Sequence, residues 1–297
     1  MIEPLNERFA QPGTLEFVRG RGDLPMARVT TPHGRGEVYL HGAHVTSWQP
    51  VGAEDLLWVS ESSRYAEGKA IRGGIPICWP WFGDDASGQG RPAHGFARTQ
   101  AFGVTRGEVL DDGSCVLELC LEPSEVTRAL WPEDFRLTLT ATFGAELDLR
   151  LGMENRSDRP VTHTAALHSY LRVGDVGRVQ LAGFAGGEYL DKVRGFARDR
   201  QDEEPRIEGE IDRVYLQTRE ALSLVDPVMQ RTLRVAKVGS HTTVLWNPGP
   251  EHARQMADLD DEGYRNMLCI EAANAHEDEV ALQPGQSHVL GTTLSLS

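Results

Sequence analysis

The sequence predicts an all-β chain, most simply folded as one sheet packed on another. Residues 135–143 and 147–153 alternate between apolar and polar positions, and Gly144-Ala145 between them indicates a tight turn. The remaining strand-like runs are short and are separated by Gly and Pro, and no comparably long amphipathic helix pattern occurs. We therefore expect a hairpin with a core face and a polar face within a β-sandwich.

The other elements follow from the same local patterns. A short helix is expected within 54–66, where Ser60 is a plausible cap residue. His41 and His44 would suit a metal pair on a helix, but the strand pattern around them places their side chains on opposite faces, so we interpret both as structural. Further strands are expected at 14–19, 26–31, 36–40, 43–48 and 116–122.

Composition and charge limit the classes of function. The chain has 297 residues, of which 40% are hydrophobic, and β-sandwiches of this size often form one domain, so we expect a single domain over 1–297. The formal net charge of -14 argues against nucleic acid and anionic membranes as partners. If the protein binds an anion, its positive charge must be gathered locally.

Targeting signals and metal motifs are not apparent. The first ten residues do not resemble a signal peptide, and no apolar stretch approaches membrane-spanning length. The cysteines show no CxxC spacing and predict reduced, buried thiols in a cytoplasmic protein without a metal site. They are Cys78, Cys115, Cys120 and Cys269.

The segment 71–98 is the most informative stretch of the chain. Its density of Gly and Pro predicts a long loop with a fixed backbone path, and its Trp residues argue against disorder. Arg72, His94 and Arg98 on this loop would suit a small anionic ligand, because guanidinium groups match carboxylate and phosphate oxygens. The residues alone leave a second interpretation open, a well-packed connection with surface arginines. The rings of Trp79 and Trp81 could stack on a ligand or pack the loop, and we expect packing.

The second half of the chain contributes four candidates. Glu271 ends the apolar run 267–270, and a buried Glu is normally paired or used; the alternative is that the strand ends there and Glu271 is solvated. His163 and His168 lie in an apolar strand pattern and could be core histidines. Asp212 precedes a strand, where Asp is most often a turn or cap residue.

Several kinds of chemistry lack their motifs. The chain has no GxGxxG or phosphate-loop motif, no GxSxG and no HExxH. What remains is a His and a Glu that could act as acid and base without a cofactor, beside arginines for an anion.

The order and spacing of several segments resemble the aldose 1-epimerase superfamily, most closely its branch of hexose-6-phosphate mutarotases (glucose-6-phosphate 1-epimerases). Each segment alone is a weak signal, and their common order is highly specific. The segments are 41–50 (HGAHVTSWQP), 71–83 (IRGGIPICWPWFG), 94–98 (HGFAR), 167–173 (LHSYLRV), 211–215 (IDRVY), 244–248 (VLWNP) and 269–274 (CIEAAN).

This resemblance implies a galactose-mutarotase-like β-sandwich, or supersandwich, with the sugar site on a concave sheet face. It implies Glu271 as general base and His168 as general acid for exchanging the anomers of a phosphosugar, with no metal and no cofactor. Since His168 must deliver a proton to the ring oxygen, we expect a nearby carboxylate to raise its pKa. The resemblance assigns substrate binding to the remaining candidates, which are Arg72, His94, Arg98 and Asp212.

Departures from the family pattern leave the sugar open. Ala93 stands where relatives often carry Gln, Ser169 and Leu171 replace commoner Thr and Phe, and 272–274 replaces a commoner Pro-Gly. Two alternatives remain: a mutarotase for unphosphorylated aldoses and a non-catalytic carbohydrate-binding protein. The latter would not require both His168 and Glu271. Nothing in the sequence suggests an obligate assembly, so we expect a monomer.

Overall fold

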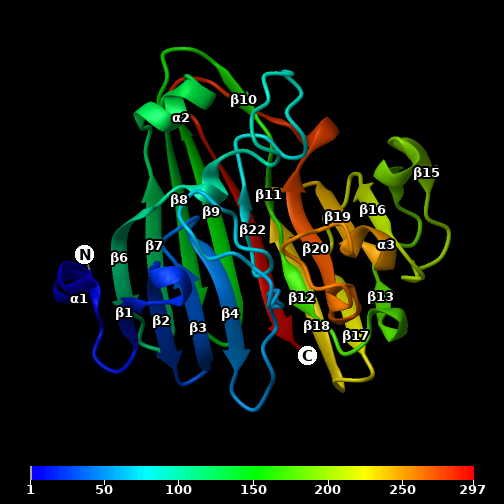
Figure 1. The fold of residues 1–297 in the computed structure, drawn as a ribbon, viewed down its shortest axis with the longest axis horizontal. Coiled ribbons are helices and arrows are strands. Elements are labelled where there is room, and N and C mark those ends of the chain that lie inside the picture. The colour runs from blue at the N-terminus through cyan, green and yellow to red at the C-terminus, as the bar shows by residue number, and fades with distance from the viewer. Residues whose placement is uncertain (1) are drawn as a thin grey trace.

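The computed structural model describes residues 2–297, and an eight-stranded antiparallel sheet forms one of its layers (Figure 1). The predicted hairpin is confirmed as the β8–β9 pair, whose apolar positions are buried and whose polar positions are partly exposed. We call this layer the back sheet. In spatial order its strands are β13 (Gln180–Ala182), β17 (Leu222–Asp226), β18 (Arg231–Val238), β22 (Ser287–Leu296), β9 (Leu147–Asn155), β8 (Phe135–Phe143), β7 (Cys115–Leu121) and β6 (Gly103–Val109).

A second eight-stranded sheet, here called the site sheet, lies across the core from the back sheet. Strand β12 (Tyr170–Arg172) pairs with β20 beside β11 rather than extending the row. The other strands, in spatial order, are β15 (Ala197–Arg200), β14 (Glu188–Asp191), β16 (Ile211–Tyr215), β19 (Thr242–Asn247), β20 (Met267–Asn274), β11 (Ala165–Leu167) and β5 (Ile77–Cys78).

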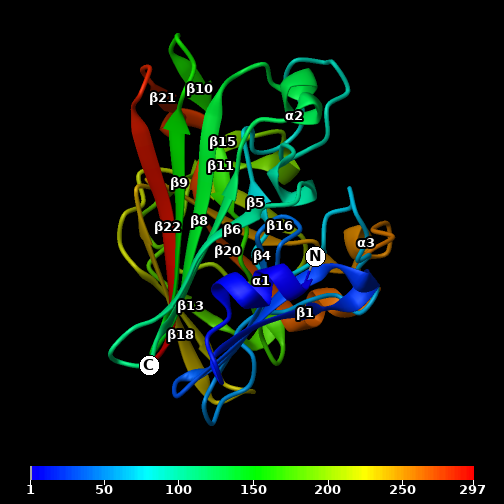
Figure 2. The same ribbon diagram turned by 90° about the vertical axis from the view of Figure 1, so that its left-hand side faces the viewer.

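A four-stranded N-terminal sheet covers the other half of the back sheet (Figure 2). Its β3 contacts β8, and the Trp48 ring lies 5.5 Å from that of Phe143 on the back sheet. One hydrophobic cluster draws buried residues from all three sheets, so they share a core. The strands are β1 (Leu15–Arg19), β2 (Pro25–Thr31), β3 (Gly34–Tyr39) and β4 (His44–Pro50).

The remaining elements are short. Strands β10 (Val161–His163) and β21 (Val280–Leu282) form a two-stranded ribbon, and the α-helices are α1 (Ile2–Phe9), α2 (Glu125–Leu130) and α3 (Gly249–Ala253). No helix within residues 2–297 combines the length and apolar character needed to cross a membrane. The 3₁₀ turns are η1 (Arg21–Asp23), η2 (Ala97–Thr99), η3 (Val176–Arg178), η4 (Lys192–Arg194), η5 (Gly263–Asn266) and η6 (His276–Asp278).

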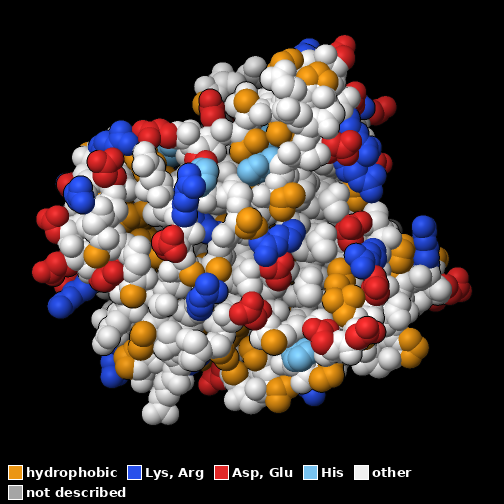
Figure 3. Space-filling model, turned by 180° about the vertical axis from the view of Figure 1, so that it is seen from behind, with side chains coloured by type: hydrophobic (Ala, Val, Ile, Leu, Met, Phe, Trp, Pro, Cys, Tyr) orange, Lys and Arg blue, Asp and Glu red, His pale blue; other side chains and the backbone are white. Residues whose placement is uncertain are grey.

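The outer face of the back sheet carries the polar side of the hairpin. Its charged side chains pair locally, as Arg150 does with Asp148 and Arg136 with Glu122. Figure 3, which views the molecule from behind, shows both charges scattered over this side among uncharged atoms. The view from behind therefore offers no single-sign surface of the kind that captures a polyelectrolyte.

The prediction of a short helix within 54–66 is wrong. Residues 54–66 form turns and isolated bridges rather than a helix. Leu57 bridges to Leu171 and Val59 to Gly73, so the backbone pairs with neighbouring segments instead of with itself. Tertiary pairing has overridden the local helix signal, and the Ser60 hydroxyl donates to the carboxylate of Asp260.

The structural interpretation of two histidines is confirmed. The Nε2 atom of His41 bonds the carbonyl oxygen of Lys69, and that of His44 bonds the carbonyl oxygen of Gly73, both at 2.7 Å. Burial lowers the pKa of His44 to about 3. Its ring is therefore neutral in the folded protein at neutral pH.

Because the His44 ring is neutral in the folded protein, the unfolding free energy should depend on pH. A folded-state pKa below the unfolded value of about 6.5 stabilises the fold above that pH, and the stabilisation is lost as pH falls, by about 1.4 kcal/mol per pH unit. Between about pH 7 and 5, wild type should lose roughly 2 kcal/mol more unfolding free energy than His44→Gln, whose amide can still donate to Gly73. Urea unfolding at both pH values measures the difference. Equal losses in the two proteins would contradict it.

Candidate active site

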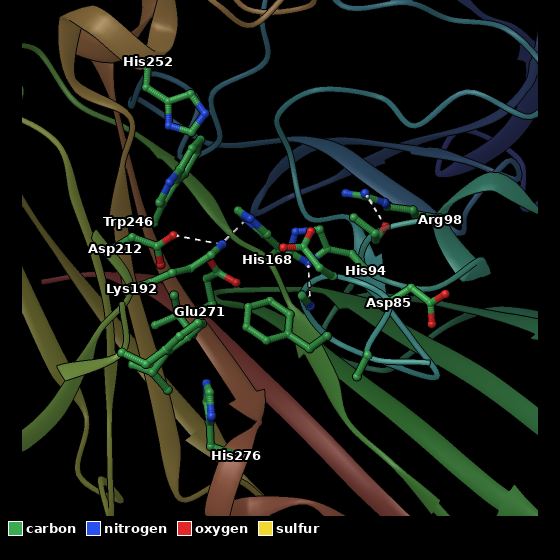
Figure 4. A pocket seen from close by; sticks show the side chains of 18 of the residues that line it. Asp85, His94, Arg98, His168, Lys192, Asp212, Trp246, His252, Glu271 and His276 are labelled. Carbon is green, nitrogen blue, oxygen red and sulfur yellow. Dashed lines mark hydrogen bonds and ion pairs between the residues drawn. The ribbon is translucent and has the colours of Figure 1, made fainter. Parts of the chain in front are cut away.

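All six residues predicted for the site line one pocket of about 590 Å³ on the open face of the site sheet (Figure 4). This volume lies in the range of about 300–1,000 Å³ that is typical of small-molecule sites. The pocket is walled by the site sheet on one side and by the 71–98 loop on the other. The predicted residues in it are Arg72, His94, Arg98, His168, Asp212 and Glu271.

Strand β20 forms the floor of the pocket, and both of its faces are buried. Leu268 and Ile270 point into the core shared with the back sheet, and Cys269 lies on the opposite face in a second hydrophobic cluster. Glu271 follows Cys269 on that second face and is 1% exposed. The continuous apolar run in the sequence thus reflects two buried faces, and the strand continues past Glu271 to Asn274. The alternative of a solvated strand end is wrong.

His168 enters the pocket where two strands are interrupted. Strand β11 pairs with β20 up to Leu167, and β12 resumes the pairing at Tyr170. The unpaired His168 lies opposite Glu271, and its Nδ1 is 3.4 Å from Glu271 Oε1. The Tyr170 ring stacks on the imidazole with centroids 4.7 Å apart and planes 10° apart. An acid and a base are therefore held side by side in a buried place.

Burial moves the pKa values of this pair in opposite directions. Desolvation, followed by the nearby Asp212, raises the pKa of Glu271 well above its usual value. Desolvation, followed by His94, Arg98 and Arg72, lowers the pKa of His168 well below its usual value. The expected increase in the pKa of His168 is wrong, because burial and neighbouring positive groups outweigh the carboxylate. The uncharged pair, with its proton on Glu271, is favoured.

His94 is fixed as a neutral ring by the 71–98 loop. Its backbone adopts a φ of 64°, and its N–H donates to the carbonyl oxygen of Gly83 at 2.7 Å. The N–H of Gly83 in turn donates to Nδ1 of His94 at 3.3 Å. Burial, followed by the positive charges of Arg98, Lys192 and Arg72, lowers the pKa of His94 to about 3. Because Nδ1 accepts a hydrogen bond, the ring proton lies on Nε2.

The two predicted arginines are held differently. Arg72 donates to the hydroxyl of Tyr170 at 2.9 Å and to the carboxylate of Asp258 at 3.1 Å. Arg98 donates to the carbonyl oxygen of Ala93 at 2.8 Å, its one side-chain hydrogen bond within the described residues. A guanidinium group has five N–H donors, so Arg98 keeps donors for a ligand. The surface-arginine interpretation does not hold for Arg72, which is mostly buried.

The loop itself agrees with the expectation of a fixed, largely irregular backbone. It contains the two-residue strand β5, and the Trp79-Pro80 peptide bond is cis. Trp79 is buried against Phe96, and the half-buried Trp81 packs against the same ring. Neither Trp lines the pocket, so packing is confirmed as their role.

Sequence reasoning missed several pocket residues. Lys192 follows β14 and forms an ion pair with Asp212, with Nζ 3.2 Å from Oδ2. Trp246 lies opposite Asp212 in the β16–β19 register, and its ring meets His168 edge-on at 5.8 Å. Trp246 stood inside a recognised segment, but nothing marked Lys192, whose neighbourhood has no periodic pattern. Further lining residues are Phe82, Asp84, Asp85, Phe196, His252, Met256 and His276.

Comparison with known proteins identifies the family. The sequence model of aldose 1-epimerase matches residues 26–295. This chain belongs to the aldose 1-epimerase family. It is 36% identical to a Salmonella typhimurium protein named "Putative glucose-6-phosphate 1-epimerase", over 97% of this chain and 98% of the relative. An Escherichia coli K12 protein of the same name is 35% identical, over 90% and 89% of the two chains.

Solved structures confirm the galactose-mutarotase-like fold of this family member. The crystal structure of a "putative mutarotase" from Salmonella typhimurium superimposes with a TM-score of 0.89 and 32% identity, covering 97% of this chain and 95% of that one. A galactose mutarotase related enzyme from Lactobacillus acidophilus shares the fold with a TM-score of 0.70 at 15% identity, covering 91% and 96%. The all-β supersandwich expectation is thereby confirmed.

The state of His94 in this epimerase-family pocket can be tested directly. Nitrogen NMR of the ring should show a neutral Nε2–H form that persists from about pH 5 to 8, because an imidazole with a pKa of about 3 does not titrate there. Comparison with His94→Gln assigns the signals. A titration midpoint inside this range, or a proton on Nδ1, would contradict the assignment.

Proposed function

We propose that the protein interconverts the α and β anomers of a hexose 6-phosphate without a cofactor. The buried pair of His168 and Glu271, opposed across a strand interruption beside the pocket's cations, carries this proposal. Glucose 6-phosphate is the first candidate substrate, because the two relatives described above are named for it.

Anomer exchange requires one proton acceptor and one proton donor. In our proposal Glu271 removes the proton of the C1 hydroxyl while His168 gives its proton to the ring oxygen. The bond from C1 to the ring oxygen breaks and the C1 carbonyl forms. After rotation about C1–C2, the ring closes on the other face and both protons return. Each positioned acid or base typically contributes about 10²- to 10⁴-fold in rate.

The pKa shifts fit this cycle. Ring opening begins with the carboxylate and imidazolium and ends with both groups uncharged. Burial favours the uncharged form, so transfer of the two protons removes charge from a desolvated place. A bound phosphate dianion would favour the imidazolium at the start of the cycle. The pair holds one proton in either form, which balances the reaction.

Three cations around the pair support the phosphosugar assignment. Arg98, Arg72 and Lys192 all lie close enough to lower the pKa of His94. We propose that Arg98 and Arg72 hold the 6-phosphate through charge-assisted hydrogen bonds. Asp212, paired with Lys192, would bind sugar hydroxyls, and the Nε2–H of His94 would donate to the sugar. The aromatic side chains of Trp246 and Phe82 also line the pocket beside these groups.

The organisation of the chain supports two further parts of the proposal. One hydrophobic cluster connects all three sheets, which supports a single domain over 1–297. We also propose that the protein acts as a monomer, because the six residues assigned to the reaction and to substrate binding lie together in one pocket of this chain. The proposed reaction uses residues of the chain alone and needs no metal or cofactor.

Replacing the proposed base should separate chemistry from binding. Glu271→Gln keeps the shape of the side chain but cannot accept the C1 proton, so turnover of glucose 6-phosphate should fall by about 10²- to 10⁴-fold with binding largely retained. NMR exchange and calorimetry measure the two effects. Glu37→Gln is the control, because Glu37 is a partly buried strand carboxyl with a raised pKa outside this pocket. Near-normal turnover of Glu271→Gln would refute the catalytic assignment.

Removing a proposed phosphate ligand should discriminate between substrates. Arg98→Ala should weaken binding of glucose 6-phosphate by roughly 10- to 100-fold, because a hydrogen bond to a charged group contributes about 1.5–3 kcal/mol. Binding of glucose should change far less. Arg106→Ala is a matched control, since Arg106 forms an exposed ion pair with Glu108 on β6. Equal losses for both sugars would assign Arg98 a structural role.

A further inference from the structure

We propose that the pocket floor is also a binding site for a thiophilic divalent metal ion such as Zn²⁺, formed by His168, Cys269 and Glu271. Occupation of this site would block the epimerase reaction reversibly. The metal site itself stands independently of the reaction, and only the inhibition rests on the function proposed above.

The strand register brings the three donors together. Cys269 and Glu271 are two residues apart on β20, so their side chains share one face of the sheet. His168 lies across from Glu271 in the interruption between β11 and β12. The imidazole nitrogen, thiol sulfur and carboxylate oxygen all lie within 4.8 Å of one another. Modest side-chain adjustment would bring them to the distances of about 2.0–2.3 Å at which zinc binds these atoms.

Two polar atoms at this place lack partners. Among the described residues, Nδ1 of His168 and Oε2 of Glu271 are buried without a hydrogen bond, and their side chains are more than nine-tenths buried. The 3.4 Å distance joins Nδ1 of His168 to Oε1 of Glu271 and does not form a hydrogen bond, and Oε2 of Glu271 takes no part in this approach. Buried polar groups without partners are costly and rare, so each one calls for a ligand or a function. A metal ion would satisfy both atoms at once.

The donor set selects the metal by its chemistry. One nitrogen, one sulfur and one oxygen match zinc sites, whereas Mg²⁺ and Ca²⁺ prefer oxygen ligands alone. A doubly charged ion bound by a thiolate and a carboxylate is neutral overall. The neighbouring Arg72, Arg98 and Lys192 therefore do not oppose the complex as they would oppose an uncompensated cation. Burial keeps the Cys269 thiol protonated, and metal binding would displace that proton.

The route and the consequence follow from the pocket. His168 and Glu271 line it, so an ion entering with solvent meets these two side chains, and their buried donor atoms reach the ion after the side-chain adjustment described above. Once both are metal ligands, neither can accept or deliver a sugar proton, and the ion occupies the place where the C1 end of the sugar would react. The expectation of no metal site considered cysteine spacing along the chain. Spacing along the chain does not reveal that the fold places His168 beside Cys269 and Glu271.

The test uses cobalt as a spectroscopic substitute for zinc, with the full-length protein. Co²⁺ should produce a thiolate-to-metal charge-transfer band in wild type and in Cys115→Ser, and none in Cys269→Ser. Cys115 is a matched control because it is an equally buried cysteine on β7, in the back sheet. If Cys269→Ser does not fold, as judged by circular dichroism, Cys269→Ala takes its place.

The activity arm tests inhibition. Zn²⁺ should inhibit anomer exchange in wild type and in Cys115→Ser, and a chelator should restore it. Cys269→Ser should retain basal turnover and require at least tenfold more Zn²⁺ for the same inhibition. A missing cobalt band, or equal zinc sensitivity of wild type and Cys269→Ser, would overturn the proposal. A cobalt band in a protein that exchanges no hexose phosphate would sustain the metal site and refute the proposed function.

Discussion

The burial of β20 on both faces is the constraint on which the rest of this structure depends. One face of the strand packs into the core shared with the back sheet, and the other holds Glu271 at the floor of the pocket. A carboxyl group in this position is desolvated, so its pKa is raised and the uncharged form is favoured beside His168. The same packing that stabilises the sandwich therefore also sets the protonation of the proposed catalytic pair.

The charge of the pocket contrasts with that of the whole chain. The protein carries a formal net charge of -14, yet Arg72, Arg98 and Lys192 converge beside the acid–base pair. Each cation is tethered by a neighbour: Arg72 by Asp258 and Tyr170, Arg98 by a carbonyl oxygen, and Lys192 by Asp212. Such tethering fixes the donors before the substrate arrives, which lowers the entropy lost on binding.

The sequence predicted the parts of the structure that depend on local pattern. The β8–β9 alternation and the Gly- and Pro-rich 71–98 loop needed no tertiary information, and the family resemblance placed six residues in one pocket. Lys192 could not be found, because its role depends on strands that pair far apart in the sequence. The helix expected over 54–66 failed for the same reason, and the pKa of His168 followed burial that no local pattern reveals.

The most direct test of this account is anomer exchange measured by NMR with glucose 6-phosphate and glucose side by side. If buried acid–base chemistry is coupled to a phosphate-binding cation cluster, the protein should accelerate exchange of the phosphosugar and leave glucose near its spontaneous rate. Equal acceleration of both sugars would show that Arg72, Arg98 and Lys192 do not select the phosphosugar. No acceleration of any hexose phosphate by the folded protein would contradict the catalytic interpretation and favour a protein that only binds carbohydrate.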